Sequence, residues 1–297
     1  MKSNVLTGEK AKAKKEKKQS QWHDVWRRLR KNPLAMIGMV IVIIMLLSAV
    51  FADVLAPYDY AKQDWKNTFQ MPSAEHLFGT DNFGRDIFSR VLKGGQMSLG
   101  VSIVSVAMAV IVGGLLGATA AYYGGLYGAI VMRCMDVVMA MPSFLLAMAV
   151  AAALGTGMVN TCIAIAIGTV PTFTRILYAS ALAVKGQEYV ESATACGAGS
   201  FRIILKHIIP NCLAPIIVNV TLRVGVAIMT ISGLSFIGLG VQPPTPEWGS
   251  IISAGREYIR DFWPIVVLPG CAIALTMIGF NLLGDGLRDA LDPKLKN

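Results

Sequence analysis

The residue types that most often carry enzymatic chemistry are few and scattered in this chain. The histidines lie far apart in sequence and predict no catalytic role; they are His23, His76 and His207. No two of the five cysteines have C-x-x-C spacing, so their pattern implies neither a zinc site nor a disulfide framework. The sequence has no G-x4-G-K-S/T motif, so ATP is not bound here by a P-loop. We therefore expect no catalytic residue, no metal site and no cofactor.

Arg223 is the one charged residue that lies clearly deep in an apolar segment. Twelve residues separate it from Asn211, which places it about 18 Å deep in a helix. A guanidinium facing lipid there would cost at least ~2.5–3.5 kcal/mol, so we expect it to face the helix bundle or a wet cavity. A buried guanidinium of this kind needs an acceptor such as a carboxylate or the carbonyls at a helix end.

One of the few long polar passages, EYVESATACGAGSFRIILKHIIP, spans residues 188–210. Helix formers occupy residues 188–196, and the Gly-Ala-Gly at 197–199 supplies a break where glycine can take a positive φ. Ser200 can cap a second short helix, which Pro210 closes. This order predicts a helix-turn-helix elbow between two apolar segments; the alternative is an ordinary loop between helices.

The remaining sequence is that of an all-α integral membrane protein. Hydrophobic residues make up 54% of the 297 residues, the mean hydropathy is +0.56, and several windows exceed the ~18 apolar residues that span a bilayer. We predict six transmembrane helices, at about 34–52, 97–121, 129–153, 158–180, 211–237 and 263–284. An even number of spans places both termini on one side of the membrane.

The positive charge indicates which side that is. Residues 1–33 hold eleven Lys or Arg and three Asp or Glu, which accounts for nearly all of the net charge of +9. This tail could bind nucleic acid or acidic lipid, but the positive-inside rule favours a cytoplasmic tail, and we expect no nucleic-acid partner. We expect disorder over residues 1–20 and an interfacial helix over 22–31. Basic residues also place the elbow in the cytoplasm: Lys185, Arg202 and Lys206.

Three further features concern the loops and spans. Within the polar outer segment at 53–96, residues 84–93 look helical, and we expect them to lie along the outer leaflet. Pro142 should bend the third span, and Arg133 and Asp136 lie three residues apart near its inner end, where they could pair. Small residues in the second span favour tight helix packing; they are Gly113, Gly114, Gly117 and Ala121.

Three motifs resemble a known family. Glu191, Ala193 and Gly197, with Pro210 thirteen residues after that glycine, resemble the EAA loop of ABC-importer permeases, although Ser192 replaces the middle alanine. The GTD-x2-GRD-x2-SR pattern at 79–90 and the GLSFIGLG and PPTPEWG runs resemble the C-type permease subunit of the dipeptide, oligopeptide and nickel importers. The resemblance covers most of the chain from about residue 22.

The resemblance implies a type I ABC-importer permease fold. The domains would be a basic cytoplasmic tail with its interfacial helix (1–33), a first transmembrane helix with an outer loop (34–96) and an importer domain of five helices (97–290) that includes the EAA loop (188–210). It implies a homologous second permease, two cytoplasmic ATPase subunits, an extracytoplasmic solute-binding protein, and the bacterial or archaeal cytoplasmic membrane. The chain itself would be no enzyme.

The same resemblance implies how the chain works. The EAA loop would couple the spans to the ATPases, through Glu191, Ala193, Gly197, Gly199 and Pro210. In the second outer loop, we expect either contact with the solute-binding protein or a lid packed on its own span ends, formed by Glu247, Trp248, Ser250 and Arg256. Peptides are the expected cargo, with nickel chelates, opines or glutathione-like compounds as alternatives. Arg223 would face the translocation pathway and meet a substrate carboxylate, or it would pair with a carboxylate or helix-end carbonyls of the partner permease. A different class, an ion-coupled secondary transporter or channel, would need deep ionisable residues; no carboxylate accompanies Arg223.

Overall fold

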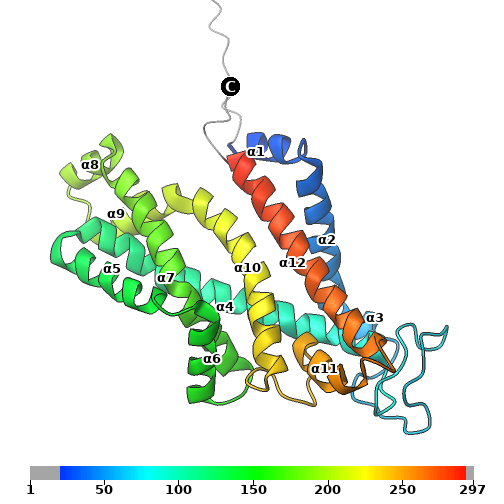
Figure 1. Cartoon of the computed structure of the whole chain (residues 1–297). Helices are drawn as coiled ribbons and strands as arrows, with labels where there is room; N and C mark the ends of the chain where they lie inside the picture. The colour runs from blue at the N-terminus through cyan, green and yellow to red at the C-terminus, as the bar shows by residue number, and fades with distance from the viewer. Residues whose placement is uncertain (1–20, 292–297) are drawn as a thin grey trace, which may run out of the picture.

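The computed structural model describes residues 21–291, and the disorder predicted for residues 1–20 of the basic tail (1–33) lies outside them. Within that range the chain is a bundle of α-helices (Figure 1) with no β-strand. The helices are α1 (Gln21–Leu29), α2 (Pro33–Val50), α3 (Ala52–Leu55), α4 (Ile87–Tyr123), α5 (Gly125–Met139), α6 (Ser143–Leu154), α7 (Met158–Lys185), α8 (Glu188–Ala195), α9 (Ser200–Ile203), α10 (Leu213–Phe236), α11 (Trp248–Gly255) and α12 (Pro264–Leu291).

Five of the described helices are long and apolar enough to cross a membrane, and the bent pair α5–α6 raises the number to six. The third predicted span is therefore broken rather than continuous. Its two halves meet at 89°, a far sharper turn than the bend expected at Pro142. The break itself has a local cause, because proline disfavours the helical conformation in the residue before it and Pro142 adopts φ −54°, ψ 129°. A new helix then starts at Ser143.

The predicted interfacial helix at 84–93 is wrong as a separate element. Residues 87–93 are the first turns of α4, a single helix of 37 residues. Gly94 and Gly95 follow these turns without ending the helix. The structure explains both glycines, since a Cβ atom at Gly95 would lie 2.9 Å from the indole of Trp248 and one at Gly94 would lie 3.0 Å from it. The paired glycines admit a tryptophan and do not end the helix.

Close packing of α4 on α7 forms the centre of the bundle and confirms the small-residue prediction. A Cβ atom at Gly113 would lie 2.6 Å from the carbonyl oxygen of Val170, and one at Gly117 would lie 2.3 Å from that of Thr174. The two backbones can approach this closely only because neither glycine carries a side chain. On the other side of the bundle, α12 packs along α2 and α10.

The helices give the molecule two different ends (Figure 1). The elbow, α1 and the end of α12 lie at one end. The outer loop, which we define as residues 56–86 between α3 and α4, lies at the opposite end with α11. This separation agrees with the two sides that the loop charges predict.

Candidate functional site: the elbow between α7 and α10

The turn of the elbow (residues 188–210) depends on Gly197. This residue has φ +79°, a conformation that side chains with a Cβ atom rarely adopt. The amide of Gly197 donates to the carbonyl of Thr194 (2.9 Å), and the amide of Ala198 donates to that of Ala193 (3.1 Å). These two bonds close α8 with a Schellman motif. Gly197 therefore sets the direction in which the chain leaves α8.

Three details of the predicted elbow are corrected. Gly199 has φ −65°, so it needs no glycine-specific conformation. It is also the N-cap of α9, which makes Ser200 the first helical residue and not the cap. Pro210 does not close the second helix, because the chain continues through a π-helical turn (Ile204–Ile208) and a 3-10 turn (Ile209–Cys212) into α10. The changes of helix type accommodate the missing N–H of proline.

The elbow has an inner apolar side and an outer exposed side. Val190, Ile203 and Ile208 are buried and pack in a cluster that includes Leu177 of α7. On the outer side, Phe201 is 74% exposed. Glu191, Arg202 and Pro210 are exposed with it, and Ala193 is half-buried. A large apolar side chain held in water by a well-anchored turn is typical of a contact surface for another protein. Sequence analysis missed Phe201, although an aromatic residue within a polar passage was a usable signal.

An open cavity of about 670 Å³ lies beside the elbow. Its lining comes from the end of α4, the end of α7 and from α8, and includes Tyr122, Tyr123, Lys185, Glu191 and Thr194. The ammonium of Lys185 donates to the carbonyl of Tyr122 (2.6 Å) and satisfies a C-terminal carbonyl of α4. This bond joins the ends of α7 and α4 beside the elbow. The elbow itself contacts α4 through its buried apolar residues, which share a cluster with Ala118 and Ala121.

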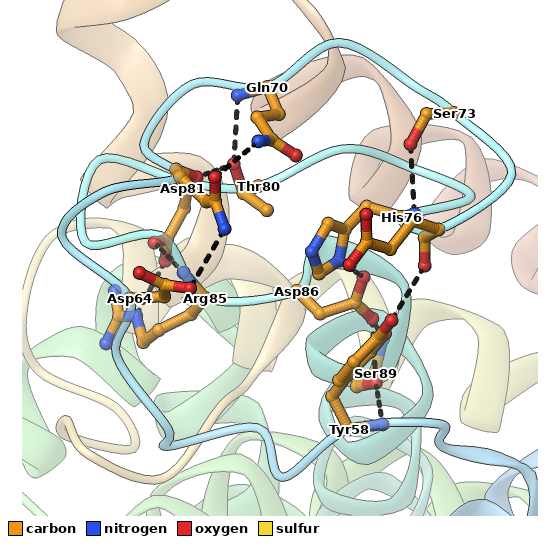
Figure 2. Close-up of polar contacts among 12 residues, drawn as sticks. Tyr58, Asp64, Gln70, Ser73, His76, Thr80, Asp81, Arg85, Asp86 and Ser89 are labelled. Atoms are coloured by element: carbon orange, nitrogen blue, oxygen red, sulfur yellow. Dashed lines mark hydrogen bonds and ion pairs between the residues drawn. The ribbon is translucent and has the colours of Figure 1, made fainter.

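The acidic side chains of the motif at 79–90, which joins the outer loop to α4, form their hydrogen bonds within the chain (Figure 2). The carboxylate of Asp81 accepts hydrogen bonds from the amides of Phe83 and Arg85 (both 2.9 Å) and from Arg85 Nε (2.7 Å). Asp86 caps α4, because its carboxylate accepts from the amide and hydroxyl of Ser89 (both 2.7 Å) and contacts His76 Nδ1 (2.9 Å). Both aspartates are 2% exposed. These contacts fold the loop onto the start of α4.

The structure also places the residues expected to contact a solute-binding protein. Glu247 is fully buried, and its carboxylate accepts from the hydroxyls of Ser98 (2.8 Å) and Ser232 (3.0 Å). Trp248 is 2% exposed, and its indole N–H donates to the carbonyl of Val91 (2.8 Å). Neither side chain is accessible to another protein here, so the predicted docking surface is corrected at these two positions: they fasten α11 to α4 and α10.

The other two residues of that prediction have different surroundings. Ser250 completes a capping box with Glu247, since its amide donates to the Glu247 carboxylate (3.1 Å) and its hydroxyl accepts from the Glu247 amide (3.2 Å). Arg256 is exposed, beside Glu257 and Arg260. Of the four residues in that prediction, Arg256 is the one whose charged side chain is open to solvent.

Arg223 lies where α6, α7 and α10 meet. It lines a cavity of about 20 Å³ together with Ser143, Thr169 and Thr230. Its side chain is half-buried, and it forms no ion pair with any other residue between 21 and 291. The cavity has room for about one water molecule. The guanidinium therefore faces hydroxyl groups and the start of α6, as expected for a charge that avoids lipid.

These features define a class of protein: a multi-pass membrane permease of the type I ABC-importer fold. A chain of the MetNI methionine ABC transporter in an inward-facing conformation has this fold, with a TM-score of 0.53 and 16% identity over 68% of this chain and 96% of that one. The sequence then places the chain within the class. It belongs to the family of binding-protein-dependent transport system inner membrane components, whose model matches residues 109–297. Residues 20–72 match the N-terminal transmembrane domain of oligopeptide transport permease C.

Two curated relatives match this chain over nearly the whole length of both proteins. The Dipeptide transport system permease protein DppC of Alkalihalophilus pseudofirmus is 45% identical over 278 residues, 94% of this chain and 91% of that protein. The Glutathione transport system permease protein GsiD of Escherichia coli is 45% identical over 276 residues, 93% of this chain and 91% of that protein. The family and the fold predicted from the sequence motifs are confirmed.

Proposed function

We propose that this chain is the permease subunit of an ATP-driven importer and forms half of the translocation pathway for di- or oligopeptides. The relatives named for dipeptide and for glutathione transport support a peptide-like cargo with a free carboxylate. Family membership favours a binding-protein-dependent system over the ion-coupled secondary transporter or channel. The other half of the pathway comes from a homologous permease subunit, and ATP is hydrolysed by two separate cytoplasmic subunits.

The observation that carries the proposal is the elbow, which is rigidly anchored and exposed on its outer side. Its apolar residues pack in one cluster with Leu177 of α7 and Ala118 of α4, so a displacement of the elbow moves both long helices. Docked in a groove of an ATPase subunit, it transmits nucleotide-driven closure to the spans as a rigid-body motion. ATP and the solute-binding protein then bias a pathway that alternates between outward and inward access.

The membrane orientation follows from the same assignment. The elbow, α1 and the end of α12 face the cytoplasm, and both termini lie on that side. The outer loop and α11 face the solute-binding protein, and the exposed group of Arg256, Glu257 and Arg260 supports a docking role at that end. Cross-linkers at Arg260 capture the binding protein if this is correct, and capture only the permease subunits if it is not.

Arg223 is proposed to face the pathway and to meet the carboxylate of the passing substrate. Its unpaired charge among hydroxyl groups supports this role over a pairing within the chain. Arg223→Gln should abolish uptake in an intact complex, and Arg223→Lys should restore part of it. Failure of both variants to assemble with the second permease would make Arg223 a structural contact to that subunit.

Purification and transport together test the proposed function. The tagged chain, expressed with its neighbouring genes, should co-purify with ATPase subunits. Proteoliposomes holding this complex and the binding protein should accumulate radiolabelled Ala-Ala or glutathione only when ATP is supplied. Uptake driven by a pH gradient without ATP would replace the proposal with the ion-coupled alternative.

A further inference from the structure

A second charged cluster lies on α5 and α7, apart from Arg223. Arg175 Nη2 of α7 forms an ion pair with the carboxylate of Asp136 on α5. Arg133 Nη1, one helical turn earlier on α5, approaches the other oxygen of the same carboxylate at 3.8 Å. The pairing of Arg133 with Asp136 was anticipated from their spacing, but the participation of Arg175 was not. We call these three residues the charged network.

The network lies part-way along two helical segments that are apolar enough to cross a membrane. Arg175 is ten residues before the end of α7 at Lys185, which corresponds to about 15 Å along the helix. Arg133 is eight residues after the start of α5 at Gly125, about 12 Å along that helix. Both positions therefore lie inside segments apolar and long enough to cross a membrane, in the half of each segment nearer the elbow. The neighbouring residues of α5 are mostly apolar.

The side chains of the network are nevertheless open. Arg133 is 83% exposed, Arg175 is 45% exposed and Asp136 is 40% exposed. Charges this exposed cannot face acyl chains without a cost of several kcal/mol. Their surroundings in the assembled transporter are therefore water or another protein. One of the two helices, α7, also contributes to the walls of the Arg223 cavity, where Thr169 lies six residues before Arg175 and so about 9 Å away along the axis.

The charge balance of the network indicates what it can bind. Two guanidinium groups share one carboxylate, which leaves one positive charge in excess. Arg175 pairs with Asp136, whereas Arg133 Nη1 lies 3.8 Å from it, and the other donors of Arg133 have no partner among residues 21–291. A guanidinium with free paired donors binds a carboxylate in a bidentate geometry. A substrate carboxylate would thus neutralise the excess positive charge and accept hydrogen bonds from Arg133.

We propose that the charged network lines the water-filled inner part of the translocation pathway and binds the carboxylate of a peptide-like substrate on its way from Arg223 to the cytoplasm. The inference rests on the proposed permease function. With Arg223 and the network in succession, the substrate carboxylate passes from one positive charge to the next and is never without a cationic partner. Transport requires several binding sites of moderate affinity of this kind, because a site that binds too tightly does not release its ligand. The competing role is a strut that pairs with the second permease.

The first test measures water access and does not depend on the cargo. In a variant whose five native cysteines are alanine, Arg133→Cys is exposed to the membrane-impermeant reagent 2-sulfonatoethyl methanethiosulfonate in inside-out vesicles holding the whole complex. The matched control is Ile44→Cys, a 57% exposed position on α2 with no charged neighbour in its helix. Modification at 133 should be at least ~10-fold faster than at 44, because the thiolate reacts only where water reaches. Equal rates would overturn the proposal.

The second test measures carboxylate recognition. Uptake of Ala-Ala and glutathione is compared with uptake of their C-terminal amides in proteoliposomes, for the wild type, Arg133→Gln, Arg133→Lys and the control Arg27→Gln on α1. Arg133→Gln should lose at least ~10-fold of free-acid uptake and much less of amide uptake, since a lost charged hydrogen bond is worth about 1.5–3 kcal/mol. Arg133→Lys should recover part of the loss, and Arg27→Gln should match the wild type.

Three results separate the possible failures. Equal loss for acids and amides, or loss of the second permease from purified Arg133→Gln complex, would overturn the inference and support the strut. Wild-type uptake by Arg133→Gln would overturn it as well. If the wild-type complex transports neither probe, the proposed peptide cargo fails, and the access measurement alone decides whether the network lines an aqueous path.

Discussion

The elbow and the outer loop carry the most distinctive polar motifs of the chain, and they differ in where their polar groups find partners. In the outer loop, Asp81 and Asp86 are buried and bonded to neighbours in the same segment. In the elbow, Glu191 and Phe201 point into solvent, and only the apolar side is fixed to the bundle. A family motif can therefore preserve a fold or a contact, and burial of its polar residues distinguishes the two.

This difference predicts opposite phenotypes. Substitutions in the outer loop should reduce the amount of folded protein and leave the activity of the folded fraction intact. Substitutions in the elbow should leave the folded amount unchanged and reduce coupled transport. The following predictions run from the largest effect to the smallest.

Asp86→Ala should destabilise the protein most, by about 2–4 kcal/mol, because it removes the cap of α4 and leaves the amide of Ser89 and the ring of His76 without their buried partner. The measurement is the thermal denaturation of the purified subunit complex in detergent. Asp59→Ala is the matched control, since exposed Asp59 accepts only the amide of Ala61 (2.8 Å), and its loss should cost less than about 0.5 kcal/mol. Equal stability of the two variants would show that Asp86, and with it the motif, does not stabilise the fold.

Gly197→Val should reduce uptake at least ~10-fold at normal abundance, because a β-branched residue at φ +79° is strained by about 1–3 kcal/mol and redirects the chain after α8. Transport in proteoliposomes and the amount of inserted protein are measured together. Gly199→Ala provides the control, since its φ of −65° accepts alanine and no atom of the described chain would contact the added Cβ within 4 Å. Normal uptake with Gly197→Val would show that the turn at Gly197 is not needed for coupling.

Phe201→Ala should weaken binding of the ATPase subunits about 10- to 100-fold, as expected for the truncation of an interface aromatic worth ~1–3 kcal/mol. The stability of the permease itself should not change, because the side chain is 74% exposed. Titration of purified ATPase onto the reconstituted permease measures the effect. Trp65→Ala in the outer loop, 66% exposed, should leave this affinity unchanged. An equal loss of affinity with Trp65→Ala would show that the effect of Phe201→Ala is not specific to the elbow.

Lys185→Met should have the smallest effect, a roughly two- to fivefold reduction in ATP-coupled uptake. The substitution keeps the aliphatic stem but removes the hydrogen bond to the carbonyl of Tyr122, worth about 0.5–1 kcal/mol at this exposed site. ATP hydrolysis and uptake are measured in parallel, and their ratio should rise as coupling loosens. A constant ratio would mean that the hydrogen bond between the ends of α7 and α4 does not transmit motion.

Several elements could be predicted from the sequence because their causes are local. Apolar runs of bilayer length indicate the spans, and glycine between two helical stretches indicates the turn at Gly197. The small residues of the second span correctly predicted close packing, since few other arrangements use Gly113 and Gly117 together. The angle at Pro142 could not be predicted, because proline permits a break but the packing of α6 on α7 sets its size.

The candidate sites show the same limit. Glu247 and Trp248 looked like surface residues because they lie in a loop rich in Gly and Pro. Their partners Ser98 and Val91 are about 150 residues away in sequence, and only the fold brings them together. Arg175 likewise joins Asp136 from another helix. Contacts between distant segments leave no mark in a single sequence, whereas helix ends and turns do.

Site-specific photo-cross-linking tests the central claim most directly. Benzoylphenylalanine is placed at Phe201 in the elbow or at Trp65 in the outer loop, and the complete transporter is irradiated in membranes with its binding protein present. The account predicts that position 201 cross-links to an ATPase subunit and that position 65 never does. Cross-linking of position 201 only to lipid or to the permease itself, in a complex that still hydrolyses ATP and transports, would contradict the assignment of the elbow as the coupling element.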